Sequence, residues 1–493
     1  MASRNAAMAA EPMGVSSPGF VKAMTLTDAT MLVAGSMIGS GIFIVSADMA
    51  RTLGSPFWLL VAWLLTGVMT MLGALAYGEM AAMYPRAGGQ YVFLREAMGP
   101  LMGFLYGWTL FVVIQTGTIA AVGVAFGRFL GVLWPAITPD RFAWFPQFDV
   151  QTPGGLIELG LTPQRLVALL TIWLLTWVNL RGVKEGKFVQ TTLSIVKTGA
   201  LAALILLGLT IGRNAEAVAV NFGSGFFSGG VGPGGFSSVF VIAFGAALVG
   251  SLFSSDAWHG VTSTAAEVKD ATRNLPRALV MGTGLVTVLY LLANVSYLSV
   301  LPFDQLQNAP QDRVGTAVAE HIFGASGATL MAIAILVSTF GCNNGLILAG
   351  ARVYWAMAKD GLFFRKAGTL SRTGVPAWAL VAQAIWTSVL CLTGTYGQLL
   401  DYVIFAALIF YAMTTAGLFV LRVKRPDVPR PYKAVGYPFL PALYIVLASF
   451  VAIVLLIADK TRAQAIPGLV VVLLGVPVYF LTKRSITAGE VES

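Results

Sequence analysis

The stretch GSMIGSGIF, residues 35–43, places glycines at positions 35, 39 and 41 inside an apolar run that extends from about Ala29 to Ala50. Glycine costs about 1 kcal/mol relative to alanine in a helix interior. If the run crosses a membrane, no water in the hydrocarbon core can satisfy backbone groups that such a sequence frees. Backbone freed at this stretch must therefore be buried in the protein or line a cavity.

The composition identifies an integral membrane protein. The chain has 493 residues, of which 57% are hydrophobic and only 11% are charged, whereas a soluble domain has about 25% charged residues. A membrane-spanning helix needs ~20 apolar residues, and twelve segments of suitable length predict an all-α membrane protein with twelve transmembrane helices. The predicted spans are 28–50, 57–83, 100–134, 164–180, 188–212, 236–264, 277–301, 327–357, 376–396, 398–421, 439–458 and 465–482.

The net charge of +9 follows membrane topology and does not indicate a nucleic-acid partner. With the N-terminus inside, most of the 31 Lys and Arg residues fall on one set of loops, and basic loops face the cytoplasm. We therefore expect both termini to be cytoplasmic in a cell (inner) membrane protein. No segment of the first 20 residues has a signal-peptide core.

Few residues suit a metal site or a disulfide bond. Cys342 and Cys391 both fall inside predicted spans, so we expect no disulfide-linked partner chain. The two histidines, His259 and His321, cannot form a multi-histidine metal site. We expect neither metal nor cofactor.

The segment around Gly39 admits two interpretations. Unwinding at Gly39, Ser40 and Gly41 would expose backbone N–H groups at the positive end of a half-helix, which suits a carboxylate. Broken helices of this kind occur in secondary transporters built from inverted repeats. Alternatively, the small residues would let another helix approach closely.

A second interruption is predicted in the sixth span, at LFSSDAWHG, residues 252–260. Ser254, Ser255 and Asp256 compete with helical hydrogen bonds through their own side chains. Asp256 would either cap the second half of a broken helix or serve the function directly, because a carboxylate in the membrane must be paired or wetted. Interruptions in the first and sixth spans suggest two inverted five-span halves.

Four sequence blocks together resemble the amino acid–polyamine–organocation (APC) transporter superfamily, and within it the L-type amino-acid transporters and their bacterial relatives. The resemblance covers residues 24 to 440. The blocks are GSMIGSGIF, AYGEMAAMYPRAGGQYVF (76–93), EVKDATRNLPRAL (267–279) and STFGCNNGLILAGARVYWAMAKDGL (338–362).

The resemblance implies a LeuT-like fold of five plus five inverted spans with two added helices, and discontinuous first and sixth spans. The predicted segments are a cytoplasmic tail (1–23), the first repeat (24–212), the second repeat (213–422), a basic cytoplasmic loop (423–438), helices 11 and 12 (439–482) and a second tail (483–493). The basic loop suits anionic lipid headgroups.

The resemblance also implies a substrate site between the two interrupted spans. The substrate carboxylate would bind the backbone of Gly39, Ser40 and Gly41, and the ammonium would meet the carbonyls of Met37 and Phe253. Phe253 would also act as a gate. The complete predicted binding set is Met37, Ile38, Gly39, Ser40, Gly41, Phe253, Ser254, Asp256 and Ala257. The family often has a small residue where Asp256 stands, so this carboxylate would favour a cationic or amine-bearing substrate, or proton coupling.

Lys197 lies inside the fifth predicted span and needs acceptors there. By the resemblance it fills the place of sodium in sodium-coupled relatives, where its ammonium would bridge the broken first span and the eighth span. Candidate acceptors on the eighth span lie near Ser338, Thr339, Cys342 and Asn343. A fixed cation would repel sodium, which predicts sodium-independent transport. The alternative is a lysine near the membrane interface.

Glu79, near the inner end of the second span, is a second gating candidate. It would pair with Arg86 or Arg95, or else reach the interface as an isolated carboxylate.

These features predict a secondary active transporter of amino acids that works by alternating access, as a sodium-independent exchanger. Proton-coupled symport of amino acids or amines stays open, as does an amino-acid sensor that does not transport. An enzyme is not expected, because the sequence has no phosphate loop, metal cluster or catalytic triad.

Overall fold

The computed structural model describes residues 20–140, 142, 145–146, 148–152, 155–227, 237–393 and 396–491. The first half contains α1 (Leu26–Met37), α2 (Gly41–Leu53), α3 (Pro56–Met83), α4 (Gln90–Met98), α5 (Pro100–Thr109), η1 (Leu110–Ile114), α6 (Gln115–Leu133), β1 (Phe148–Thr152), β2 (Gly155–Leu159), α7 (Pro163–Arg181), α8 (Val183–Leu209), α9 (Ala215–Ala219) and η2 (Val220–Ser224). The second half contains α10 (Ser238–Ser254), η3 (Trp258–Glu267), α11 (Ala271–Val300), α12 (Phe303–Gln307), η4 (Pro310–Asp312), α13 (Val314–Phe323), α14 (Ala325–Lys359), η5 (Arg365–Gly368), α15 (Ala377–Thr393), α16 (Tyr396–Lys424), α17 (Phe439–Ile457) and α18 (Asp459–Val491).

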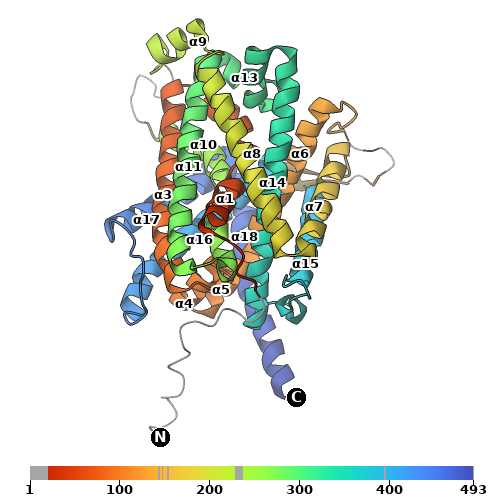
Figure 1. Ribbon diagram of the computed structural model, residues 1–493, viewed down its shortest axis with the longest axis vertical. Coiled ribbons are helices and arrows are strands. Elements are labelled where there is room, and N and C mark those ends of the chain that lie inside the picture. The colour runs from red at the N-terminus through yellow and green to blue at the C-terminus, as the bar shows by residue number, and fades with distance from the viewer. Residues whose placement is uncertain are drawn as a thin grey trace.

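The long helices form one bundle, with the short helices α9 and α13 at one end and α4 at the other (Figure 1). Inside the bundle α1 packs against α8, α11 and α14, while α2 packs against α10. The two halves of the first predicted span therefore have different neighbours. Ion pairs join loops that were predicted to share one side of the membrane, including Arg425 with Glu96 at 3.8 Å.

Helices overlie all twelve predicted spans, but not all of them qualify as spans on their own. Among the described residues, nine helices are long and apolar enough to cross a membrane, or ten if the bent pair α1–α2 counts as one. Neither α7 nor α15 passes this test. A multi-pass membrane protein is thus established, and twelve crossings remain a prediction.

The connection between α6 and α7 contains a feature that an all-helical prediction omits. The strands β1 and β2 pair antiparallel, with Phe148 opposite Leu159 and Asp149 opposite Glu158. The sequence FDVQT alternates apolar and polar residues, which is the period of a strand and not of a helix. The bundle itself is helical as predicted, and the hairpin is a short addition confined to this loop.

The start of α1 is fixed by local chemistry. Thr25 is the N-cap and forms a capping box with Asp28, each side chain bonding the other residue's backbone N–H. Lys187 on α8 adds an ion pair to Asp28 at 2.8 Å and donates to the Ala23 carbonyl at 2.9 Å. These contacts hold the first helix against α8 before the chain reaches its first interruption.

Candidate functional site

The first predicted span is interrupted at the glycine-rich stretch. Helix α1 ends at Met37, α2 begins at Gly41, and the two helices are bent by 41°. Between them Ile38 is extended, with φ −73° and ψ 93°. A Cβ atom on Gly41 would lie 2.2 Å from Ser254 Oγ, so the absence of a side chain lets α2 begin directly against α10. The predicted break is present, and close packing accompanies it.

Lys197 lies at this break and not at the membrane interface. Its side chain is 2% exposed, and Nζ donates to the carbonyl oxygens of Gly35, Ile38 (2.7 Å) and Ser338 (3.1 Å). The ammonium thus joins the end of α1 to α14. The interface alternative is wrong, because three backbone acceptors satisfy the three N–H donors of the lysine inside the bundle.

The residues predicted on α14 divide into two groups. The Ser338 hydroxyl lies 3.1 Å from the Ile38 carbonyl and 3.3 Å from that of Gly39, and Cys342 Sγ donates to the Ser36 carbonyl at 3.0 Å. Asn343 faces another direction: its Nδ2 is 3.6 Å from where a Cβ of Gly123 would stand on α6. Its buried amide has no hydrogen-bond partner among the described residues.

The sixth predicted span is also interrupted. Helix α10 ends at Ser254, and a 3₁₀ helix, η3, begins at Trp258. Between them Ala257 adopts the left-handed conformation with φ 64° and holds the N-cap position of η3. The hypothesis that Asp256 caps the second half is therefore wrong, since the capping position falls one residue later.

The Asp256 side chain is held by α16. The Tyr411 hydroxyl donates to the carboxylate and also lies 3.0 Å from His259 Nδ1. Asp256 and Tyr411 border a small cavity of about 20 Å³ whose wall also includes residues of α3 and α17. The carboxylate thus faces these helices.

Tyr290 on α11 connects the two interruptions. Its hydroxyl lies 3.0 Å from the Met37 carbonyl at the end of α1 and 3.0 Å from the Ser254 carbonyl at the end of α10. The sequence reasoning did not identify this residue, because a single tyrosine in an apolar span gives no signal of its own. Its importance comes from the packing of α11 against α1.

The environment of Glu79 corrects the predicted pairing. The carboxylate is fully buried and binds Arg422 through two hydrogen bonds of 3.0 and 2.6 Å, Arg430 at 3.3 Å and the Ala434 backbone N–H at 2.7 Å. Arg86 and Arg95 instead contact Glu96. The prediction of Arg86 or Arg95 is wrong because the end of α16 and the basic loop pack onto α3, through contacts between residues more than 340 apart in sequence.

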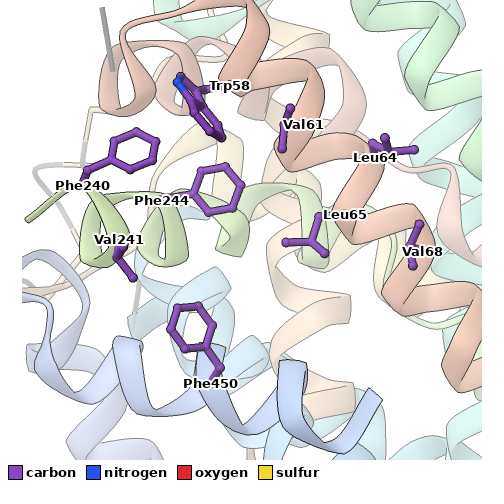
Figure 2. A pocket seen from close by; sticks show the side chains of 9 residues that line it. All are labelled: Trp58, Val61, Leu64, Leu65, Val68, Phe240, Val241, Phe244 and Phe450. Atoms are coloured by element: carbon purple, nitrogen blue, oxygen red, sulfur yellow. The ribbon is translucent and has the colours of Figure 1, made fainter. Parts of the chain in front are cut away.

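A larger cavity of about 380 Å³ lies elsewhere on the bundle (Figure 2). Figure 2 shows aromatic and aliphatic side chains of α3, α10 and α17 around it. The lining residues are Trp58, Val61, Leu64, Leu65, Val68, Phe240, Val241, Phe244 and Phe450. This open, apolar hollow offers nothing to bind the charged ends of a zwitterion, so it is not the candidate site.

A helical membrane bundle with two interrupted helices that meet through shared contacts is the architecture of a secondary transporter, whose substrate binds where the helices break. In this chain the interruptions are those between α1 and α2 and between α10 and η3.

Comparison with known sequences gives the family. The profile of the amino acid permease family matches residues 24–478, so the chain belongs to that family. The serine/threonine exchanger SteT of Bacillus subtilis is 30% identical over 469 residues, covering 94% of this chain and 98% of that protein. The human large neutral amino acids transporter small subunit 2 is 30% identical, with 93% and 80% covered. The mouse b(0,+)-type amino acid transporter 1 is 28% identical, with 93% and 88% covered.

The family assignment confirms the APC resemblance drawn from the sequence blocks. It also places the chain among membrane transporters and not among enzymes. Transmembrane amino-acid transport is therefore the activity class of the family to which the chain belongs.

Proposed function

We propose that the chain exchanges amino acids across the cell membrane by alternating access, without sodium. The observation that carries this proposal is the Lys197 ammonium bound to backbone carbonyls at the break between α1 and α2. Relatives named as exchangers or transporters of serine, threonine and other amino acids support it.

The substrate carboxylate binds the N-terminus of α2. The first turn of any helix has N–H groups without intrahelical partners, and α2 begins at Gly41 directly after the break. A carboxylate at Gly39, Ser40 and Gly41 would accept hydrogen bonds from these N–H groups and would be stabilised by the positive end of the helix dipole. Ile38, whose carbonyl is bound by Lys197, sets the direction of this loop.

The substrate ammonium binds the carbonyl ends of the two interrupted helices. Met37 O accepts from Tyr290, and Phe253 O accepts from the Asp256 backbone N–H at 3.1 Å. A carbonyl oxygen has two lone pairs, so it can accept an ammonium donor beside a backbone N–H or a hydroxyl. Ser254 and Ala257 form the adjacent backbone.

Sodium independence follows from charge. Lys197 brings a positive charge to within hydrogen-bonding distance of the carbonyls that would otherwise be free to coordinate a cation. A second cation at the same place would be repelled strongly, because the interior has a low dielectric constant. Ser338 reinforces the arrangement, and Asn343 lies five residues further along α14.

We assign gating to Phe253 at the end of α10 and to Glu79 on α3. Phe253 is 7% exposed beside the break, and Glu79 ties α3 to α16 and the basic loop. Twelve crossings, inverted repeats over 24–212 and 213–422, helices 11 and 12, and cytoplasmic termini complete the proposed arrangement. No cofactor or disulfide-linked partner takes part.

Exchange in proteoliposomes tests the proposal. Uptake of labelled amino acids is measured with and without internal amino acid, with sodium replaced by potassium, and with an imposed pH gradient. We expect uptake to require internal substrate and to be unchanged by sodium. Uptake into empty vesicles that is accelerated by external acid would establish proton symport instead, and binding without flux would indicate a sensor.

A further inference from the structure

The Tyr411 hydroxyl contacts both sides of the break in α10. It donates its single proton to the Asp256 carboxylate, so its oxygen accepts from His259 Nδ1–H at 3.0 Å. His259 Nε2 then lies 3.5 Å from the Tyr106 hydroxyl. One side chain of α16 thus joins the residue before Ala257 to a residue in the first turn of η3.

The backbone between Asp256 and His259 needs such support. Ala257 is left-handed, with φ 64°, a conformation that residues other than glycine rarely adopt and that persists only where the surroundings impose it. Trp258 and Tyr411 pack with ring centroids 5.7 Å apart, and His259 and Tyr411 with centroids 5.0 Å apart. The ring and hydroxyl of Tyr411 therefore both act on this turn.

Asp256 is accommodated on the side of α10 that faces α3, α16 and α17. The cavity beside it measures about 20 Å³, which is enough for one water molecule. The lining comes from α3, α10, α16 and α17 together with Trp258, so the cavity lies on the side of the break where Tyr411 holds the carboxylate.

We propose that Tyr411 is a positioning residue for transport. Its contacts to Asp256 and His259 hold the backbone conformation at the break after α10. The Phe253 carbonyl accepts from the Asp256 backbone N–H, so this conformation also fixes the direction of that carbonyl. This inference rests on the proposed function, in which that carbonyl binds the substrate ammonium. Because every amino acid has the same ammonium, Tyr411 affects all substrates alike.

The test compares Tyr411→Phe with the wild-type chain in proteoliposome exchange. We expect KM to rise about 10-fold, the effect of losing a hydrogen bond to a charged group. The maximal rate should stay within about twofold, since KM rises alone when uniform binding is lost. The KM ratio between serine, leucine and lysine should not change. Tyr444→Phe is the matched control, because Tyr444 lines the same cavity from α17, and it should leave KM unchanged.

Two further variants separate positioning from general structural support. Asparagine places a side-chain N–H donor where histidine has Nδ1, so His259→Asn should retain a near wild-type KM while His259→Ala should not. Asp256→Asn combined with Tyr411→Phe should raise KM no more than Tyr411→Phe alone, because the contact that asparagine weakens by losing the charge is already absent in Tyr411→Phe.

Three results would overturn the inference. A changed preference among serine, leucine and lysine in Tyr411→Phe or Asp256→Asn would make Asp256 a substrate ligand. A reduced yield of folded protein with KM unaltered would make Tyr411 merely structural. Unchanged amide hydrogen exchange across residues 253–260 in Tyr411→Phe would contradict the positioning itself. This last measurement needs no transport, so it still judges the inference if the wild-type chain exchanges no amino acid and the proposed function fails.

Discussion

The two helix interruptions solve the same physical problem by opposite means. At the first, between Met37 and Gly41, the backbone itself supplies the polar groups, and distant side chains come to it: Lys197 from α8 and Ser338 from α14 bind its carbonyls. At the second, between Ser254 and Trp258, the interrupted segment supplies its own carboxylate and imidazole, and the distant Tyr411 joins them.

The difference indicates how each break is suited to its proposed task. In the proposed function the N–H groups of the first break bind the substrate carboxylate, while a buried cation binds carbonyls at the same break. The second break is supported by side chains that bind Asp256 and His259. The Tyr290 hydroxyl links the two breaks, with 3.0 Å to a carbonyl of each.

Removal of the cation is expected to have the largest effect. Lys197→Ala removes the ammonium from the buried carbonyls of Gly35, Ile38 and Ser338, and breaking a buried charged contact costs about 3–5 kcal/mol. We expect exchange to fall by at least about 100-fold in proteoliposomes.

The matched control for Lys197 is the next residue. The Thr198 hydroxyl is buried without a hydrogen-bond partner among the described residues, so Thr198→Val should retain exchange. If Lys197→Ala exchanged normally, the first break would not depend on a cation supplied by another helix, and the contrast between the two breaks would disappear.

Added volume at the first break should have the next largest effect. In Gly41→Ala the new methyl group would stand 2.2 Å from Ser254 Oγ, and overpacking costs about 1–3 kcal/mol. Exchange should fall about 10-fold, with partial recovery in the double variant Gly41→Ala/Ser254→Gly.

Alanine substitutions at two other glycines provide controls for Gly41→Ala. A Cβ on Gly39 would lie 3.3 Å from Cys342 Sγ, and a Cβ on Gly199 would meet nothing within 4 Å. Gly39→Ala should therefore be milder than Gly41→Ala, and Gly199→Ala should be silent. The same loss in all three variants would show that helix propensity, and not contact between the breaks, determines the effect.

Loss of the shared hydroxyl should produce a moderate effect. Tyr290→Phe removes the contact to both carbonyls, and a net hydrogen bond contributes about 0.5–1.5 kcal/mol. We expect exchange to fall about fivefold. Tyr354→Phe is a suitable comparison, since its buried hydroxyl has no partner among the described residues; equal rates for the two variants would argue against a link between the breaks.

The smallest effect is expected at Cys342. Serine retains a donor for the Ser36 carbonyl, which Cys342 Sγ reaches at 3.0 Å, so Cys342→Ser should keep exchange within about twofold. A loss as large as that of Lys197→Ala would mean that the shape of this contact matters more than its hydrogen bond.

The sequence predicted the positions of the breaks because their cause is local. Glycines 39 and 41 and the run Ser254–Ser255–Asp256 weaken a helix wherever they occur, and both helices do end there. Lys197 was also identifiable, because a lysine inside an apolar span requires acceptors, although its carbonyl partners on α1 came from the resemblance and not from the pattern.

The partners of Asp256, Glu79 and the two carbonyl ends could not be predicted in this way. Tyr411, Arg422 and Tyr290 are ordinary residues of apolar or basic segments, and only the packing of helices distant in sequence brings them to their partners. The β1–β2 hairpin was not predicted for another reason: two five-residue strands in a loop give a much weaker sequence signal than a membrane-spanning apolar run.

An experimental structure of the chain with a bound amino acid tests the central claim most directly. We expect the ligand carboxylate to lie within hydrogen-bonding distance of the Gly39–Gly41 N–H groups. We expect its ammonium to lie near the carbonyls of Met37 and Phe253. A ligand bound away from both interruptions, or α1 and α2 joined as one continuous helix around the bound amino acid, would contradict the claim.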